Sequence, residues 1–154
     1  MKFRIAYKKD LEFIVSLLAN DNLGKLREDF RIPLPACYQD AFDQIQNDKN
    51  QELVVMEDSK NQIIGTFQLS FIPYLTYQGG IRAQIEAVRI HKDHRGQELG
   101  SKMLEWAIDR AKAKGAHVLQ LTTDKRRPEA LRFYEKMGFE ASHEGMKLHF
   151  KKLK

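Results

Sequence analysis

A chain of 154 residues with 42% hydrophobic residues has the length of one domain and enough apolar side chains for a single core. It contains no run of about 18 apolar residues, and its first ten residues lack the apolar stretch of a signal peptide, so we expect neither a membrane span nor export, and a cytoplasmic location. The net charge of +5 would attract phosphate-bearing molecules, but the positive residues are spread out, so a nucleic-acid partner is not expected.

The first half of the chain changes from strand to helix periodicity and then back to strands. Residues 3–7 alternate like a strand, and Asp10 is a suitable N-cap for the helix that follows. Gly24, Pro33 and Pro35 interrupt the next stretch, which is long enough to be a binding loop. The predicted elements are a strand at 3–7, a helix at 10–19, an irregular connection at 20–36, a helix at 37–48, and strands at 52–58 and 63–75.

The second half holds the longest predicted helix. Apolar residues recur along 97–115 on one wide stripe, and Gly115 suits the position just after a helix end. The predicted elements are a turn at 76–80, a strand at 81–90, the helix at 97–115, a strand at 117–123, a helix at 128–137 stopped by Gly138, and a weakly alternating strand at 146–153.

The order of these elements predicts a three-layered α+β or α/β fold, with a mixed, mainly antiparallel sheet and helices on both faces. The strand–helix–strand unit at 81–123 is expected to make a parallel crossover. A ligand would bind at the carboxyl ends of the two strands of this unit. No linker or internal repeat divides the chain, so residues 1–154 are expected to form a single domain.

The segment "VRIHKDHRGQELG", residues 88–100, leads from a strand to the start of the long helix. A helix N-terminus exposes unpaired N–H groups and the positive end of the helix dipole, so it can bind phosphate. Gly96 and Gly100 let the backbone approach closely, and Arg95 adds a permanent cation. The spacing matches neither a P-loop nor a dinucleotide-binding motif, so on these residues alone a simple turn remains an alternative to a phosphate loop.

Two segments together resemble the GNAT superfamily of acyl-coenzyme A-dependent N-acyltransferases. Residues 95–100 are similar to that family's R/Q-x-x-G-x-G/A phosphate loop, and "ALRFYEKMGF", residues 130–139, matches its A-x-x-[FL]-Y-E-K-x-G-F segment. The order of elements agrees over essentially the whole chain. The resemblance implies a GNAT-like fold whose strand–helix–strand unit binds the cofactor, acetyl-coenzyme A as the acyl donor, and direct transfer of the acetyl group to a primary amine.

The resemblance also implies which residues contact the cofactor. It implies that the strand 81–91 splays away from the strand 117–123, leaving backbone N–H groups free for the thioester carbonyl and the pantetheine amides. Two positions depart from the family pattern: Glu98 stands where the first glycine is usual, and Arg127 stands where many members have an asparagine. The implied cofactor-binding residues are Val88, Arg89, Ile90, Arg95, Gly96, Gln97, Glu98, Leu99, Gly100, Ser101 and Arg127.

Tyr134 is the expected general acid. Its position is that of a tyrosine that often has this role in the family, and a phenol with a pKa of about 10 can give its proton to a thiolate whose pKa is about 8.5–10. The alternative is an aromatic residue that only packs against Phe133 and Phe139.

Glu86 is the expected general base, acting through one water. By the period of two it shares a strand face with Val88 and Ile90, and partial burial would raise its pKa toward the working range. The alternative is a surface charge paired with Arg82 or Gln84.

Glu98 is the main departure from the family's loop. A carboxylate at the first turn of a helix is favoured by the helix dipole, but it would repel a phosphate bound at the same place. We therefore expect its side chain to turn outward toward Lys102, four residues on. Glu98→Gly is then expected to tighten coenzyme A binding and to lower the melting temperature of the empty protein.

The remaining candidates are weaker. The single cysteine, Cys37, could carry the acyl group in a ping-pong scheme, but no histidine lies near it in the sequence. His143, Glu144 and His149 lack a usual metal-ligand spacing, so no metal is expected.

The partner expected from this reading is a small-molecule or peptide amine, and an exposed edge strand would allow a homodimer. A non-catalytic acyl-coenzyme A sensor and a nucleic-acid-binding domain are the alternative functions. The sequence does not name the acceptor.

Overall fold

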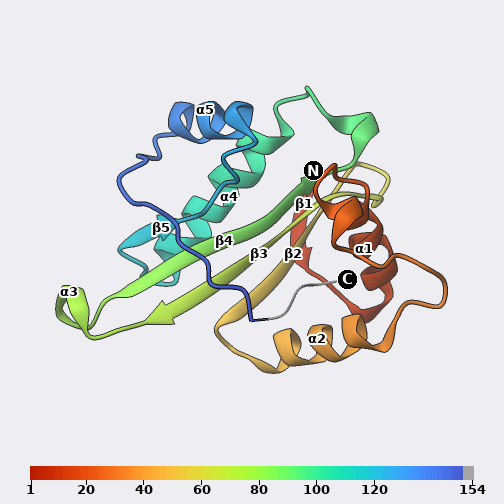
Figure 1. Cartoon of the computed structure of the whole chain (residues 1–154), viewed down its shortest axis with the longest axis horizontal. Helices are drawn as coiled ribbons and strands as arrows, with labels where there is room; N and C mark the ends of the chain where they lie inside the picture. The colour runs from red at the N-terminus through yellow and green to blue at the C-terminus, as the bar shows by residue number, and fades with distance from the viewer. Residues whose placement is uncertain (151–154) are drawn as a thin grey trace.

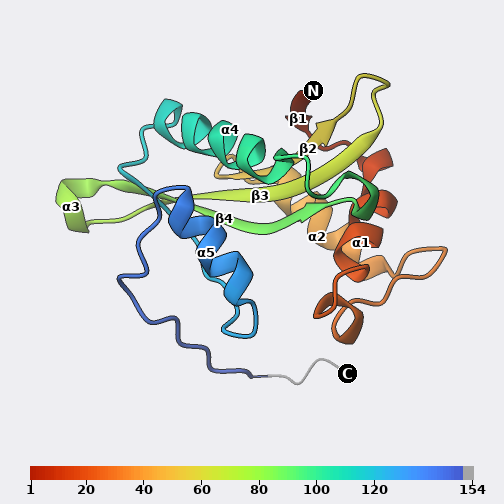
Figure 2. The same ribbon diagram turned by 90° about the horizontal axis from the view of Figure 1, so that it is seen from above.

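The computed structural model describes residues 1–150, which form a sheet between two layers of helices (Figures 1 and 2). The strands follow the order β1-β2-β3-β4-β5, with antiparallel pairing from β1 to β4 and parallel pairing between β4 and β5. The expected mixed, mainly antiparallel sheet is therefore confirmed. The elements are β1 (Lys2–Ile5), α1 (Leu11–Ala19), α2 (Ala36–Asn47), β2 (Gln51–Glu57), β3 (Ile63–Pro73), α3 (Thr76–Gly79), β4 (Ile81–Ile90), α4 (Leu99–Ala113), β5 (Val118–Gln120) and α5 (Pro128–Lys136).

The larger core lies between the sheet and α4. The apolar stripe predicted for this helix is buried at Leu99, Met103, Leu104, Ala107 and Ala111, which pack on apolar side chains of β2, β3 and β4. Burial of each such side chain stabilises the fold by about 1.5–3 kcal/mol before the loss of chain entropy is counted. The helix ends as predicted, because Gly115 adopts the left-handed backbone with φ 76°.

A second core lies on the opposite face of the sheet, beneath α1 and α2. Leu11, Ile14 and Val15 of α1 and Phe42 of α2 pack there on alternate residues of β2. Two groups of ion pairs with buried carboxylates join the layers. Arg4 contacts Asp10 and Glu57 at 2.6 Å each, and Glu52 on β2 accepts from the partly exposed Arg110 on α4. No helix among residues 1–150 is long and apolar enough to cross a membrane.

Two predicted element ends and one predicted strand are wrong. Asp10 lies next to α1 but does not cap it, because its carboxylate is bonded to Arg4 and to the backbone N–H of Tyr7. The strand predicted at 117–123 is paired only over Val118–Gln120. The strand predicted at 146–153 is absent from residues 146–150, which have neither helix nor strand, and its last three residues lie outside the described part of the chain.

Candidate active site

β4 and β5 separate at the edge of the sheet. Their parallel ladder pairs Arg82, Ala83 and Gln84 with Val118, Leu119 and Gln120, and β4 then continues to Ile90 without β5 beside it. Figure 2 shows α5 on the side of the sheet opposite α4, and the ring of Phe133 on α5 would lie 3.1 Å from a Cβ at Gly100, near the start of α4. The split leaves one edge of β4 with unpaired backbone groups, which must be satisfied by water or by a ligand.

A β-bulge lies at the split and changes the direction of the side chains. Thr66 of β3 pairs with Arg89 and Gln68 pairs with Glu86, so two β4 residues lie opposite one β3 residue, and Ala87 has a left-handed φ of 54°. Val88 and Ile90 pack on the α4 core, whereas Glu86 pairs across from Gln68 on the α1 and α2 face.

The predicted shared face of Glu86 with Val88 and Ile90 is therefore wrong, because one inserted residue reverses the alternation. The predicted partial burial of Glu86 is also wrong, because its side chain is exposed. Its carboxylate accepts a hydrogen bond of 2.9 Å from Gln84, which in turn accepts one of 2.8 Å from Gln120 on β5. Glu86 thus belongs to a polar row that crosses from β4 to β5.

The loop before α4 has the backbone features of an anion cradle. In the described structure no backbone N–H of residues 96–101 donates a hydrogen bond, so several donors are open at the start of this helix. Gly96 has a φ of 78°, and a Cβ at Gly100 would lie 3.1 Å from the ring of Phe133. Arg95 lies on the surface beside these groups and donates to the carbonyl of Ile90. The residues present fit a pyrophosphate.

Glu98 precedes α4 in a left-handed conformation, with φ 57° and ψ 14°. Its side chain is exposed, as expected, but it makes no ion pair with Lys102 within residues 1–150. Left-handed backbone is unfavourable for a side chain with a Cβ and costs nothing extra for glycine. The expectation that Glu98→Gly lowers the melting temperature treated Glu98 as a helical residue, and its backbone contradicts that reasoning.

Tyr134 lies on α5 between aromatic neighbours. Its ring centroid is 5.3 Å from that of Phe133 and 5.8 Å from that of Phe139. The ring of Tyr134 therefore packs against both aromatic neighbours, as the alternative to a catalytic role expected. Burial raises the pKa of the Tyr134 hydroxyl above its ordinary value, and the charges of Arg89 and Arg127 only partly oppose this. The phenol is therefore neutral at physiological pH and able to donate a proton.

A charged cluster that the sequence did not reveal joins three distant segments. Asp21, in the connection after α1, accepts from Arg89 at the end of β4 at 3.3 Å and also from Arg127 at the start of α5. Burial acts to raise the pKa of Asp21, but the two guanidinium groups hold it below its ordinary value. Sixty-eight and 106 residues separate these partners along the chain, so no local pattern could have paired them.

The other candidates do not converge on this site. Cys37 is exposed on the first turn of α2, and His143 contacts only its neighbour Ser142 among the hydrogen bonds described. Within residues 1–150 no group of three histidine, cysteine or acidic side chains could hold a metal ion.

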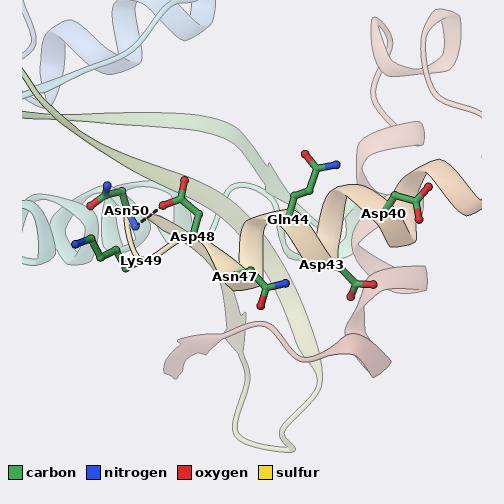
Figure 3. A pocket seen from close by; sticks show the side chains of 7 residues that line it. All are labelled: Asp40, Asp43, Gln44, Asn47, Asp48, Lys49 and Asn50. Carbon is green, nitrogen blue, oxygen red and sulfur yellow. Dashed lines mark hydrogen bonds between the residues drawn. The ribbon is translucent and has the colours of Figure 1, made fainter.

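A broad hollow of about 870 Å³ lies elsewhere, along the outer side of α2 (Figure 3). Its side chains point in different directions along the exposed helix and do not converge on one point. It is lined only by polar and charged residues from positions 40–50. The split between β4 and β5, with open donors and a half-buried phenol, is the better candidate for chemistry.

Comparison with known proteins shows which family the chain resembles. The model of the acetyltransferase (GNAT) family matches residues 21–139. The chain is similar to the aminoalkylphosphonate N-acetyltransferase of Salmonella typhimurium, at 32% identity over 82 residues, or 53% of either chain. It spans about half the length of the curated relatives that it matches.

Solved structures match nearly the full chain. A Bacillus halodurans C-125 protein described as a transcriptional regulator is 54% identical, with a TM-score of 0.93 over 97% of this chain and 99% of that one. Glucosamine-6-phosphate N-acetyltransferase from Arabidopsis thaliana shares the fold, with a TM-score of 0.77 and 23% identity over 97% of this chain and 98% of that one.

Proposed function

The chain belongs to the acetyltransferase (GNAT) family, and on that basis we propose that it transfers the acetyl group of acetyl-coenzyme A directly to a primary amine. The observation that supports this most is the pairing of an open anion cradle at the start of α4 with the split between β4 and β5. The name of the Salmonella relative, an N-acetyltransferase, supports transfer to nitrogen.

The cradle would hold the cofactor by its phosphates. The open N–H groups of residues 96–101 and the Arg95 guanidinium would bind the pyrophosphate, and the unpaired edge of β4 at Val88–Ile90 would bind the pantetheine amides. When bound, the cofactor supplies an activated acetyl thioester. Because these contacts are largely made by backbone atoms, most side chains of the loop are replaceable.

Two side chains would transfer the protons of the reaction. Glu86 would take a proton from the ammonium form of the acceptor through a water, which leaves a neutral amine whose lone pair forms the new C–N bond. The nitrogen then loses a second proton, which replaces the one that Tyr134 gives up. Tyr134 would give its proton to the sulfur that leaves as the C–S bond breaks. The exposed position of Glu86 is compatible with this role, because a base that acts through water needs solvent beside it.

The experiment that tests the proposal measures release of free thiol from acetyl-coenzyme A. The amines offered are polyamines, amino acids, aminoglycosides and peptide N-termini, and each product is confirmed by a mass increase of one acetyl group. We expect acetylation of at least one class, abolished by omission of either substrate. Thiol release without an acetylated amine would contradict the proposal.

The competing function is a non-catalytic sensor of acyl-coenzyme A. The description of the Bacillus halodurans protein as a transcriptional regulator favours this alternative and, beside it, nucleic-acid binding. Tight coenzyme A binding without amine acetylation would support the sensor. Binding to DNA that weakens steeply with salt would support the nucleic-acid reading.

We also propose a homodimer, and a cytoplasmic location. Met146, Leu148 and Phe150 are 81–92% exposed and alternate along the segment after α5, which runs along the outside of the molecule (Figure 2). The outer edge of β5 has no strand partner among residues 1–150. Light scattering should give a dimer mass that becomes a monomer mass when the three apolar residues are replaced by serine; a monomeric wild type would contradict this.

A further inference from the structure

The charged cluster around Asp21 holds more positive than negative charge. The Asp21 carboxylate contacts both Arg89 and Arg127, and its remaining partner is the neutral backbone N–H of Gly24 at 3.2 Å. The side chains of Asp21 and Arg89 are each only 14% exposed, and that of Arg127 is 27% exposed. One carboxylate therefore neutralises one of two largely buried guanidinium groups, and the second positive charge is left without a counter-ion among the described ion pairs.

Arg89 also has an unused donor. Its Nη groups bond to Asp21 and to the carbonyl of Val88, but its buried Nε has no hydrogen-bond partner in the described structure. A buried charged donor without a partner is costly, and an oxyanion is the group that satisfies it best. Burial lowers the pKa of Arg89 from its ordinary value. The negative charge of Asp21 acts to raise this pKa, and the positive charge of Arg127 acts to lower it further.

The cluster lies beside the proposed proton donor. Arg89 is on the part of β4 that has separated from β5, and Arg127 immediately precedes α5. The charges of both arginines act on the Tyr134 hydroxyl. Asp21 comes from the connection between α1 and α2, the segment expected from its length to frame a ligand. An anion held by the two arginines would thus lie within one small molecule's length of the reacting groups.

Resting on the proposed function, we propose that the acceptor amine carries an oxyanion, a carboxylate or a phosphonate, which Arg89 and Arg127 bind. In the empty protein the Asp21 carboxylate takes the place of this group. The acceptor's oxyanion adds the missing negative charge at the exposed parts of the two guanidinium groups. Asp21 then competes with the acceptor for the same guanidinium groups.

The first test compares amines that differ only in the acid. The pairs are L-methionine with L-methioninamide, and 2-aminoethylphosphonate with ethanolamine. The ratio of KM values within each pair should favour the acid at least tenfold, and the pair with the larger ratio identifies carboxylate or phosphonate. In Arg89→Gln and Arg127→Gln the ratio should fall toward one. Arg126→Gln is the matched control, because Arg126 pairs with Asp124 and should leave the ratio unchanged.

Asp21→Asn separates acceptor binding from a structural role. A purely structural ion pair predicts that this variant loses stability and binds no ligand better. Competition predicts the opposite for binding: KM for the acidic amine should fall several-fold, while KM for its uncharged counterpart changes little. If the variant is folded by circular dichroism and neither KM value falls, the proposal is overturned.

A direct binding measurement keeps the inference testable if no amine is acetylated. Methylphosphonate and acetate, which have no amine, are titrated calorimetrically into protein saturated with coenzyme A. Binding should be lost in Arg89→Gln, retained in Arg126→Gln and strengthened in Asp21→Asn. Oxyanion binding without any acetylation would refute the proposed function alone, and acetylation of amines with no preference for an acid would refute this inference alone.

Discussion

Glu98 offers a sharp test of how the loop is built, because its backbone is left-handed while its neighbour's is not. Only Glu98 has a positive φ among residues 97–99, so Gln97→Gly serves as the matched control. Glycine at Glu98 removes a conformational cost of about 1–2 kcal/mol. Against this stand the added chain entropy of glycine, about 0.5–1 kcal/mol, and the lost dipole contribution of an exposed carboxylate, about 0.3 kcal/mol.

The net effect of Glu98→Gly is a gain of about 0.5 kcal/mol, whereas Gln97→Gly brings only the entropy loss of about 0.5–1 kcal/mol. The two variants should differ in melting temperature by about 2–6 °C, with Glu98→Gly the more stable. Glu98→Ala retains the strain but not the charge, and it should fall below the wild type. Thermal melts of the empty proteins give the comparison, and equal destabilisation by both glycine variants would refute the reasoning.

The same variant reports on the cofactor. Removing a like charge beside the pyrophosphate should tighten coenzyme A binding by about two- to fivefold at low salt and by less at high salt. Isothermal titration at two salt concentrations measures this. Weaker binding by Glu98→Gly would show that the carboxylate helps to organise the cradle.

Three further predictions concern the proposed proton donor, the proposed base and the ion pairs of the core. Tyr134→Phe should lower turnover by about 10- to 1000-fold with coenzyme A affinity within a few-fold, and because the pKa of Tyr134 is raised, the wild-type rate should not lose this donor below pH about 10; unchanged turnover would exclude the role. Glu86→Gln should reduce the rate most at low pH, and a pH profile of unchanged shape and height would make Glu86 structural. Burial acts to raise the pKa of Glu52, but Arg110 and Lys114 hold it below its ordinary value, so its contribution is present above pH about 4.3 and is lost as the pH falls. Since both cations are more than a third exposed, Glu52→Gln should cost about 1–2 kcal/mol at pH 7 and less at pH 3 in denaturant titrations; an equal cost at both would contradict the ionic account.

Much of the fold could be predicted because its signals are local. The stripe of α4 and the glycine after it lie within one stretch of sequence, and the helix forms where they indicate. The same holds for the helix stopped by Gly138, whose φ is 90°. The loop before α4 was predicted for the same reason, since its glycines, arginine and helix start are consecutive.

The orientation of Glu86 could not be predicted, because it depends on one residue. Ala87 carries no signal of a bulge, and the extra residue shows only in the register with β3. Strand alternation assumes that no residue is inserted, so an unseen bulge reverses every later assignment along β4. The backbone of Glu98 escaped prediction in a similar way, because its residue type favours a helix.

The sequence by itself determined the order of elements up to α5, the glycine-containing loop before α4 and the position of the phenol on α5, since each depends on residues that are neighbours along the chain. The resemblance implied that β4 separates from β5, but only the tertiary structure showed that the separation begins after Gln84, that Glu86 faces α1 and α2, and that Asp21 contacts Arg89 and Arg127. The physical reason is that these features depend on which groups become buried together when the chain folds. A carboxylate and two guanidinium groups are drawn together where the packing of three distant segments removes water, and no spacing along the chain encodes that meeting.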